Sequence, residues 1–168
     1  NDAPVVTVDT TGAVTEDAAS PTLSDSGTLS FTDVDTSDTH SVTSNFNTDT
    51  VWSGGTLSAG EVTALTSGFS ANASGWTYNV ANADVQFLAA GESVTFSYDV
   101  TVTDSSGGSD TDTVTITING SNDAPVVTVD TTGAVTEDAA SPTLSDSGTL
   151  SFTDVDTSDT HSVTSNFN

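Results

Sequence analysis

The chain has no cysteine, no methionine, no lysine and no arginine. The absence of cysteine excludes a disulfide framework and any thiolate metal site. No run of 18 apolar residues occurs, so no transmembrane helix is predicted. Without lysine or arginine the chain has nothing with which to neutralise phosphate groups, so we expect no nucleic-acid partner. We likewise expect no membrane insertion.

What the chain has instead is acid. It carries 24 Asp and Glu residues and a formal net charge of −24, and only four of the 24 are Glu, which leaves 20 Asp. Such a charge destabilises a compact state through self-repulsion. Either a solvated surface spreads the carboxylates apart, or bound cations neutralise clusters of them. The excess of short Asp side chains favours Ca²⁺, which takes about six to eight oxygen ligands.

The sequence also repeats itself. Residues 122–168 are identical to residues 1–47, which gives a period of 122 − 1 = 121 residues. Solenoid repeats are about 20–50 residues long, whereas roughly 100–150 residues is the size of a whole domain. We therefore expect residues 1–121 to form one complete domain and residues 122–168 to be the first 47 residues of the next. A unit permuted to residues 48–168 is the alternative.

Alternation of apolar and polar residues predicts an all-β fold. In Ser93–Asp104 every second residue, from Val94 to Val102, is apolar, and a second alternating segment follows the turn sequence SSGG. These two segments predict a long antiparallel hairpin. Shorter strands are expected at Val5–Val8, Ala13–Glu16, Thr28–Thr32, His40–Asn45, Thr56–Leu57, Glu61–Leu65 and Trp76–Val80, with a 3₁₀ or helical turn within Ala83–Glu92. Seven or more short strands indicate an immunoglobulin-like antiparallel β-sandwich.

Aromatic residues separate into core and surface candidates. Trp76 and Tyr78 lie in an alternating strand and are expected to pack in the core. Trp52 is followed by SGG and is the better candidate for an exposed aromatic contact.

The carboxylates concentrate in motifs at predicted strand ends, and in a sandwich such ends collect at two poles. The motifs are NDAP (Asn1 and Asp2, repeated as Asn122 and Asp123), TED (Glu16 and Asp17, repeated as Glu137 and Asp138), TDVDTSD (Asp33, Asp35 and Asp38, repeated as Asp154, Asp156 and Asp159) and TDSSGGSDTD (Asp104, Asp110 and Asp112). Carboxylates that converge at a pole without bases repel each other unless a divalent ion lies among them. Turn capping and plain solvation are the alternative explanations.

One segment resembles a known family. Residues Leu88–Pro125, LAAGESVTFSYDVTVTDSSGGSDTDTVTITINGSNDAP, resemble the VCBS repeat of very large, type I-secreted bacterial surface proteins of the RTX adhesin class. Gly27–Asp35 and Gly75–Tyr78 fit that repeat as well, whereas Thr48–Ser74 fits poorly. The resemblance implies a bacterial cadherin-like or immunoglobulin-like sandwich in a tandem array.

Cadherins bind Ca²⁺ at domain junctions, and the likeness implies a ligand set here. The ligands at the junction would come from the linker Asn119–Asp123, which includes Asn122, and from Glu16, Asp17, Glu92, Asp154 and Asp156; the matching half-site at the N-terminal pole would be Asn1, Asp2, Asp33, Asp35 and Asp104. Two departures remove charge: Asn119 replaces the first linker aspartate, and Ala90-Gly91 precedes Glu92. One or two ions per junction are therefore expected rather than three.

The function expected from these features is that of a calcium-stabilised extender. Stiff repeats of about 40 Å each, given strands of roughly 33 Å, would project an adhesive tip from a bacterial cell surface, or in a secreted protein, for cell adhesion and biofilm formation. Its partners would be neighbouring identical repeats. The alternatives are a carbohydrate-binding or homophilic adhesion module, or the subunit of a strand-exchanged filament. No enzyme is expected, because Asp38, His40 and Ser41 are neighbours in sequence and not a triad in space.

Overall fold

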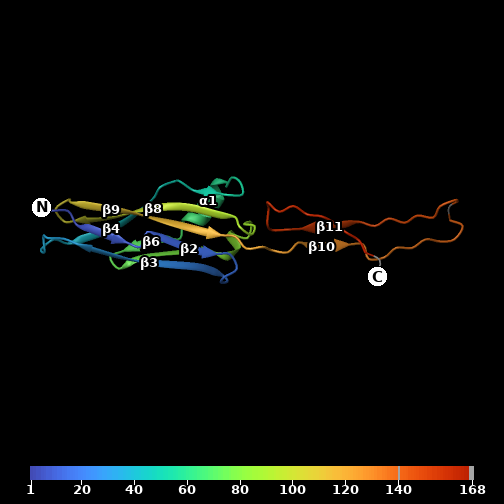
Figure 1. Cartoon of the computed structure of the whole chain (residues 1–168), viewed down its shortest axis with the longest axis horizontal. Coiled ribbons are helices and arrows are strands. Elements are labelled where there is room, and N and C mark those ends of the chain that lie inside the picture. Colours follow the sequence, from blue (N-terminus) through green and yellow to red (C-terminus); the bar gives the residue numbers. More distant parts are fainter. Residues whose placement is uncertain (140, 167–168) are drawn as a thin grey trace.

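The computed structural model describes residues 1–139 and 141–166, and the fold is mostly β (Figure 1). Residues 5–119 form two β-sheets, which we call the two-sheet unit, and residues 122–166 carry one further hairpin, which we call the hairpin segment. The elements are β1 (Val5–Val8), β2 (Thr11–Thr15), β3 (Thr22–Thr32), β4 (His40–Phe46), β5 (Val51–Trp52), α1 (Ala59–Thr66), β6 (Phe69–Asn72), β7 (Gly75–Ala81), the 3₁₀ helix η1 (Asn82–Asp84), β8 (Ser93–Asp104), β9 (Ser109–Asn119), β10 (Val126–Val129) and β11 (Leu150–Thr153).

One sheet has the order β1-β3-β7-β6, and the other has the order β2-β9-β8-β4, with β5 also paired to β8. The long hairpin predicted from alternation is confirmed as β8 and β9, which pair from Ser93↔Asn119 to Thr103↔Ser109. All pairs are antiparallel except one, because β2 runs parallel to β9. Antiparallel strands were predicted throughout, and this single exception positions the candidate site described below.

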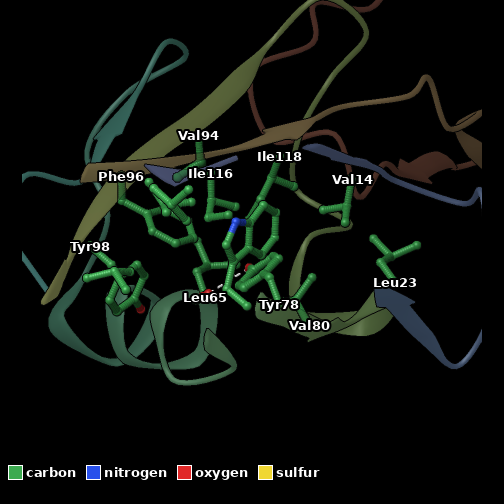
Figure 2. Packing of buried hydrophobic residues seen from close by; sticks show 14 of the residues in the cluster. Val14, Leu23, Leu65, Tyr78, Val80, Val94, Phe96, Tyr98, Ile116 and Ile118 are labelled. Carbon is green, nitrogen blue, oxygen red and sulfur yellow. Dashed lines mark hydrogen bonds between the residues drawn. The ribbon is translucent and has the colours of Figure 1, made fainter. Parts of the chain in front are cut away.

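The two sheets enclose one hydrophobic core. The alternating residues of β8 and β9 point into it, together with Val14 of β2, Leu23 of β3 and Val80 of β7 (Figure 2). Trp76 is 1% exposed and Tyr78 is fully buried, which confirms both as core residues. The Tyr78 hydroxyl donates to the carbonyl of Leu65 at 2.7 Å, so its polar atom is satisfied within the core.

Two glycines make room for the Trp76 indole. A Cβ atom at Gly12 in β2 or at Gly27 in β3 would overlap the indole ring. The indole N–H donates to the carbonyl of Asp9 at 2.7 Å, which fixes the ring between these two strands. The absence of a side chain at Gly12 and Gly27 is therefore a packing requirement.

The segment Glu61–Leu65, predicted as a strand, is part of a helix, and that prediction was wrong. Ser58 caps α1 through a capping box: its hydroxyl accepts from the Glu61 N–H at 3.3 Å, and the Glu61 carboxylate accepts from the Ser58 N–H at 2.6 Å. These hydrogen bonds lower the pKa of Glu61. The S-x-x-E pattern is a helix-start signal, and it outweighs the short alternation after it.

Other local predictions had mixed outcomes. No strand forms at Thr56–Leu57, and β5 and β6 were not predicted. The expected turn in Ala83–Glu92 begins as η1, one residue earlier. In the described residues, no helix is long and apolar enough to cross a membrane.

The hairpin segment repeats the local structure of its first copy but not its burial. Val126↔Thr153 in β10 and β11 reproduces the register Val5↔Thr32 of β1 and β3. Yet Val127 is 59% exposed, whereas its counterpart Val6 is 7% exposed. The difference arises because β7 and other parts of residues 48–121 pack on the first copy, whereas no described strand packs on the second in this way.

We expect Gly27→Ala to lower the free energy of unfolding by roughly 1–3 kcal/mol, because the added methyl group overpacks the Trp76 site. Gly60→Ala is the matched control. Gly60 lies within α1, and its nearest neighbour to an added Cβ is Ser58 Oγ at 3.9 Å, so alanine there should stabilise by about 0.5–1 kcal/mol. Urea unfolding of both variants measures the difference, and equal stabilities would contradict the packing argument.

Candidate metal site

The parallel pairing of β2 with β9 brings the ends of these two strands to the same pole of the two-sheet unit, which we call the exit pole. Thr15 pairs with Asn119, so Glu16 and Ser121 leave the sheet side by side. The Glu16 N–H donates to the Asn119 carbonyl at 2.9 Å, and the Ser121 N–H donates to Glu16 Oε2 at 2.9 Å. Glu16 Oε1 accepts from the side-chain amide of Gln86 at 2.9 Å. The carboxylate is thus held in place and only 2% exposed.

Two aspartates of the hairpin segment approach this carboxylate. The Asp123 N–H donates to Asp156 Oδ2 at 2.8 Å, and Asp156 is 1% exposed. Asp156 Oδ1 and Asp123 Oδ2 are both buried and have no hydrogen-bond partner. The Thr157 hydroxyl donates to the Phe87 carbonyl at 3.5 Å, a further contact between the hairpin segment and the exit pole. Two buried oxygens without partners are costly unless something absent from the protein chain satisfies them.

The pKa values of the carboxylates at this pole also indicate negative charge that the protein chain does not compensate. The pKa of Glu16 is raised to about 7, mainly by burial; the hydrogen bond from Ser121 opposes this rise, and the nearby carboxylates of Asp123, Asp17 and Asp156 add to it. Burial is also the main cause that raises the pKa of Asp156. No lysine or arginine exists in the chain to offset these charges.

Asp17 lies beside Glu16 but has a different environment. Its carboxylate accepts from the side-chain amides of Asn82 at 2.7 Å and Gln86 at 3.1 Å, and these bonds lower its pKa. Asn82 and Gln86 were not predicted as site residues, and neither was Ser121. Gln86 lies within Ala83–Glu92, where the sequence predicted a 3₁₀ or helical turn but gave no sign of a site residue.

The two copies of the repeat provide an internal comparison. In the first copy the Asp2 N–H donates to Asp35 Oδ2 at 2.7 Å, the same bond that joins Asp123 to Asp156. Asp35 is only partly buried, however, whereas Asp156 is buried. The hydrogen bond between the two aspartates therefore comes from the repeated sequence, whereas the burial of Asp156 comes from contact with the exit pole.

The opposite pole, where the N-terminus lies, gathers the predicted residues Asn1, Asp2, Asp33, Asp35 and Asp104; we call it the entry pole. Asn1 donates its side-chain amide to Asp104 at 3.2 Å, and Asp33 Oδ1 accepts from the Asp35 N–H at 2.8 Å. His40 Nε2 lies 2.8 Å from Asp33 Oδ2, and this hydrogen bond lowers the pKa of Asp33; His161 and Asp154 repeat the contact at 2.7 Å.

Asp104 is largely committed to the turn between β8 and β9. Its Oδ1 accepts from the N–H groups of Ser106 at 2.8 Å and Gly108 at 2.9 Å. Burial alone would raise the pKa of Asp104, but hydrogen bonds from Asn1 and from the turn outweigh it, and the pKa is lowered.

Three predicted ligands have partners of their own. Glu92 Oε2 accepts from the Trp52 indole N–H at 3.1 Å and from the Ala89 N–H at 3.3 Å. The side-chain amides of Asn119 and Asn122 donate to the carbonyls of Val14 at 3.4 Å and Asp123 at 2.8 Å. The structure therefore brings Glu16, Asp17, Asp123 and Asp156 to one pole and turns Glu92 toward Trp52. Trp52 is itself partly buried, with its ring 5.0 Å from that of Phe87.

The neighbouring residues Asp38, His40 and Ser41 bond to different groups. His40 contacts Asp33, the Ser41 hydroxyl donates to the Thr103 carbonyl at 3.4 Å, and Asp38 accepts from Ser106 at 3.0 Å.

The fit of a cation to the exit pole rests on the kind of donors present. Within the described ranges, no three His, Asp or Glu side chains have the arrangement of a preformed metal site. The available donors are hard oxygens, two of them buried and without partners. Such donors suit Ca²⁺ or Mg²⁺ and not a soft transition metal. Any cation would have to draw these carboxylates closer together.

Comparison with known proteins gives no family assignment. No model of a known protein family matches the chain, and no curated protein sequence matches it with significance.

We expect the stability of the metal-free protein to depend on pH through Glu16. Because burial raises its folded-state pKa from 4.5 to about 7, folding favours the protonated form. The stability that the protonated carboxyl contributes is fully present below about pH 4.5 and is lost as the pH rises through about 7. Glu16→Gln, which is neutral at every pH, should therefore gain stability relative to the wild type between these two pH values. Urea unfolding in EDTA from pH 4 to pH 8 measures the gap, and a constant gap would contradict this account.

Proposed function

We propose that the chain is part of a calcium-stabilised extender of the VCBS type, a tandem array of immunoglobulin-like sandwiches in which Ca²⁺ joins one repeat to the next. The observation that carries this proposal is the junction itself. Asp156 is 1% exposed with Oδ1 unpartnered, next to the unpartnered Oδ2 of Asp123, and both residues add to the charge felt by buried Glu16. In our proposal, Glu16, Asp123 and Asp156 are the principal ligands.

Calcium fits these donors better than magnesium does. Mg²⁺ demands a near-ideal octahedron and retains its waters, whereas Ca²⁺ accepts irregular sets of carboxylate, carbonyl and water oxygens. The exit pole offers carboxylates from three separated positions in the chain, together with the exposed Asp17. An irregular, flexible ligand set of this kind favours the larger ion.

The repeated sequence explains how one junction would become an array. The exit pole contributes Glu16, and the start of the next copy contributes the Asp-Asp pair, seen as Asp123–Asp156 and again as Asp2–Asp35. Each copy would then offer one half-site at each end. Cross-linking the half-sites with cations would suppress bending at every linker.

An extracellular location on or near a bacterial surface follows from the same proposal. Extracellular calcium modules bind with Kd values of about 10⁻⁴–10⁻³ M, which suits calcium levels outside cells and not inside them. The net charge of −24 without any lysine or arginine and the resemblance of Leu88–Pro125 to adhesin repeats support this location.

The test is a thermal melt of the chain in millimolar Ca²⁺ and in excess EDTA. Binding to the folded state alone stabilises by RT ln(1 + [Ca²⁺]/Kd), which is about 1.4 kcal/mol at a tenfold excess of ligand over Kd and about 2.7 kcal/mol at a hundredfold excess. For a unit of this size, at roughly 4 °C per kcal/mol, we expect an upward shift in Tm of about 5–10 °C. Identical melts in the two buffers would contradict the proposal.

The repeat supplies a matched control for this test. Asp156→Asn should abolish most of the calcium-dependent shift, because it removes a ligand at the junction. Asp35→Asn changes the same position of the same local motif at the entry pole, where no preceding copy contacts it. It should leave most of the shift intact. Equal effects of the two variants would place the calcium elsewhere.

A second candidate function, the strand-exchanged filament, has one observation in its favour. The hairpin segment exposes Val127, Leu150 and Phe152, whose counterparts in the first copy pack against residues 48–121. In a strand-exchanged filament, residues 48–121 of a second chain would cover this exposed face of the hairpin segment. The carbohydrate-binding alternative has less support, because Trp52 is partly buried and its N–H is committed to Glu92.

Because the chain contains no cysteine, exchange is testable with engineered disulfides. Ser26 lies opposite Thr77 in the β3–β7 pair, and Ser147 is the counterpart of Ser26 in the hairpin segment. Oxidised Ser147→Cys/Thr77→Cys should form a ladder of linked chains if the segment exchanges between molecules. Ser26→Cys/Thr77→Cys is the control and should form a disulfide within one chain. If the oxidised Ser147→Cys/Thr77→Cys variant stays monomeric after refolding at high concentration, strand exchange between chains is excluded.

A further inference from the structure

Tension applied at the two ends of the chain enters the two-sheet unit through β1 and β2 and leaves it through β9. The N-terminus lies at the entry pole, and the chain leaves for β10 from the exit pole at the opposite end (Figure 1). Along this path β2 and β9 lie side by side and run in the same direction. We propose that the two-sheet unit is a tension-bearing module whose mechanical clamp is the parallel β2–β9 pair. This role goes beyond that of a spacer, and it depends on topology and not on a bound metal.

The parallel direction decides how force acts on the hydrogen bonds between these strands. Tension pulls the start of β2 toward the entry pole and the end of β9 toward the exit pole, so the strands must slide past each other along their length. The pair spans five residue positions, Thr11↔Thr115 to Thr15↔Asn119. In this shear geometry the bonds between the strands share the load and must break together. Two strands pulled from the same end would instead separate one bond at a time.

Hydrogen bonds close the clamp at both of its ends. At the start, the Thr115 N–H donates to the Thr10 carbonyl at 2.9 Å, and at the finish the Glu16 N–H donates to the Asn119 carbonyl at 2.9 Å. The Glu16 carboxylate then accepts from Ser121, beyond the end of β9. Force that arrives through the linker therefore meets a contact with β2 before it reaches the ladder.

Packing protects the ladder from water. Val14 of β2 and Ile116 and Ile118 of β9 are buried in the common core (Figure 2). Shielded backbone hydrogen bonds exchange with water less readily, and the strands cannot slide without moving these side chains out of a close-packed interior.

The entry strand is loaded in the same way. β1 pairs with β3 over four positions, and the Val6 N–H donates to Asp110 Oδ2 on β9 at 2.9 Å. Asp110, which sequence analysis left between a ligand and a solvated residue, therefore ties β1 to the clamp strand.

Single-molecule force spectroscopy on the whole chain, held at its two ends in EDTA, tests the clamp without any contribution from metal. Unfolding of residues 11–119 should appear as one main event that releases roughly 370 Å of chain at about 3.4 Å per residue. Forced unfolding reports the unfolding rate along the pulled direction, and not the equilibrium stability.

A pair of proline variants locates the clamp. Thr115→Pro removes the N–H group that donates to the Thr10 carbonyl. The Thr115 side chain is exposed, so the substitution leaves the core side chains in place. We expect the unfolding rate at fixed force to rise about tenfold. Ser53→Pro removes another backbone donor, the one accepted by Ser93, but lies off the path between β2 and β9. It should unfold at wild-type force. If the two variants are equally stable in urea and also unfold at the same rate under force, the proposal is overturned.

A change of pulling direction tests the same idea in a chain with a native clamp. A cysteine at Ser106, exposed in the β8–β9 turn, places the second handle at the entry pole, the pole that also holds Asn1. Pulling between residues 1 and 106 should open the pairs one at a time and need clearly less force than pulling between the two ends of the chain. A force that does not depend on direction would overturn the clamp. A calcium-independent melt, by contrast, would overturn only the proposed metal junction.

Discussion

The pairing of β2 with β9 in parallel is the constraint on which the rest of this structure depends. Because the two strands end at the same pole, Glu16 and Ser121 meet there, and the linker leaves the two-sheet unit beside a buried carboxylate. An antiparallel pair would have placed Glu16 at the other end of β9, away from the linker. The same pairing gives the unit opposite entry and exit poles, so one geometric fact underlies both the proposed metal junction and the proposed clamp.

Uncompensated charge is the second organising feature. Most carboxylates in the described structure find backbone or side-chain donors, as Asp104 does in its turn and Asp17 does beside Asn82 and Gln86. The oxygens of Asp123 and Asp156 that lack donors are at the junction, where burial also raises the pKa of Glu16. Evenly spread solubilising charge would not concentrate its unsatisfied atoms at one buried place, and for that reason we favour a bound cation over plain solvation.

The identical sequences of residues 1–47 and 122–168 separate what is local from what is not. Both copies form the same strand register, the same Asp-Asp hydrogen bond and the same His-Asp contact. They differ in burial, since Val6 packs in a core while Val127 faces solvent. Burial also distinguishes Asp35 from Asp156, but here the residue of the second copy, Asp156, is the buried one. Neighbours in space, and not the sequence of the segment, decide whether these side chains are buried.

The amino-acid sequence by itself determined the β-rich class, the long β8–β9 hairpin, the core positions of Trp76 and Tyr78, and the concentration of acid at strand ends, because alternation and turn residues act over a few positions. It misled at Glu61–Leu65, where a capping box outweighed a short alternation, and it could not show that Glu92 turns toward Trp52. Only the tertiary structure decided that β2 runs parallel to β9, that Gln86 and Ser121 hold Glu16, and that Asp156 is buried. Each of these depends on contacts between residues 33 to 105 positions apart in the chain, for which no local pattern carries information.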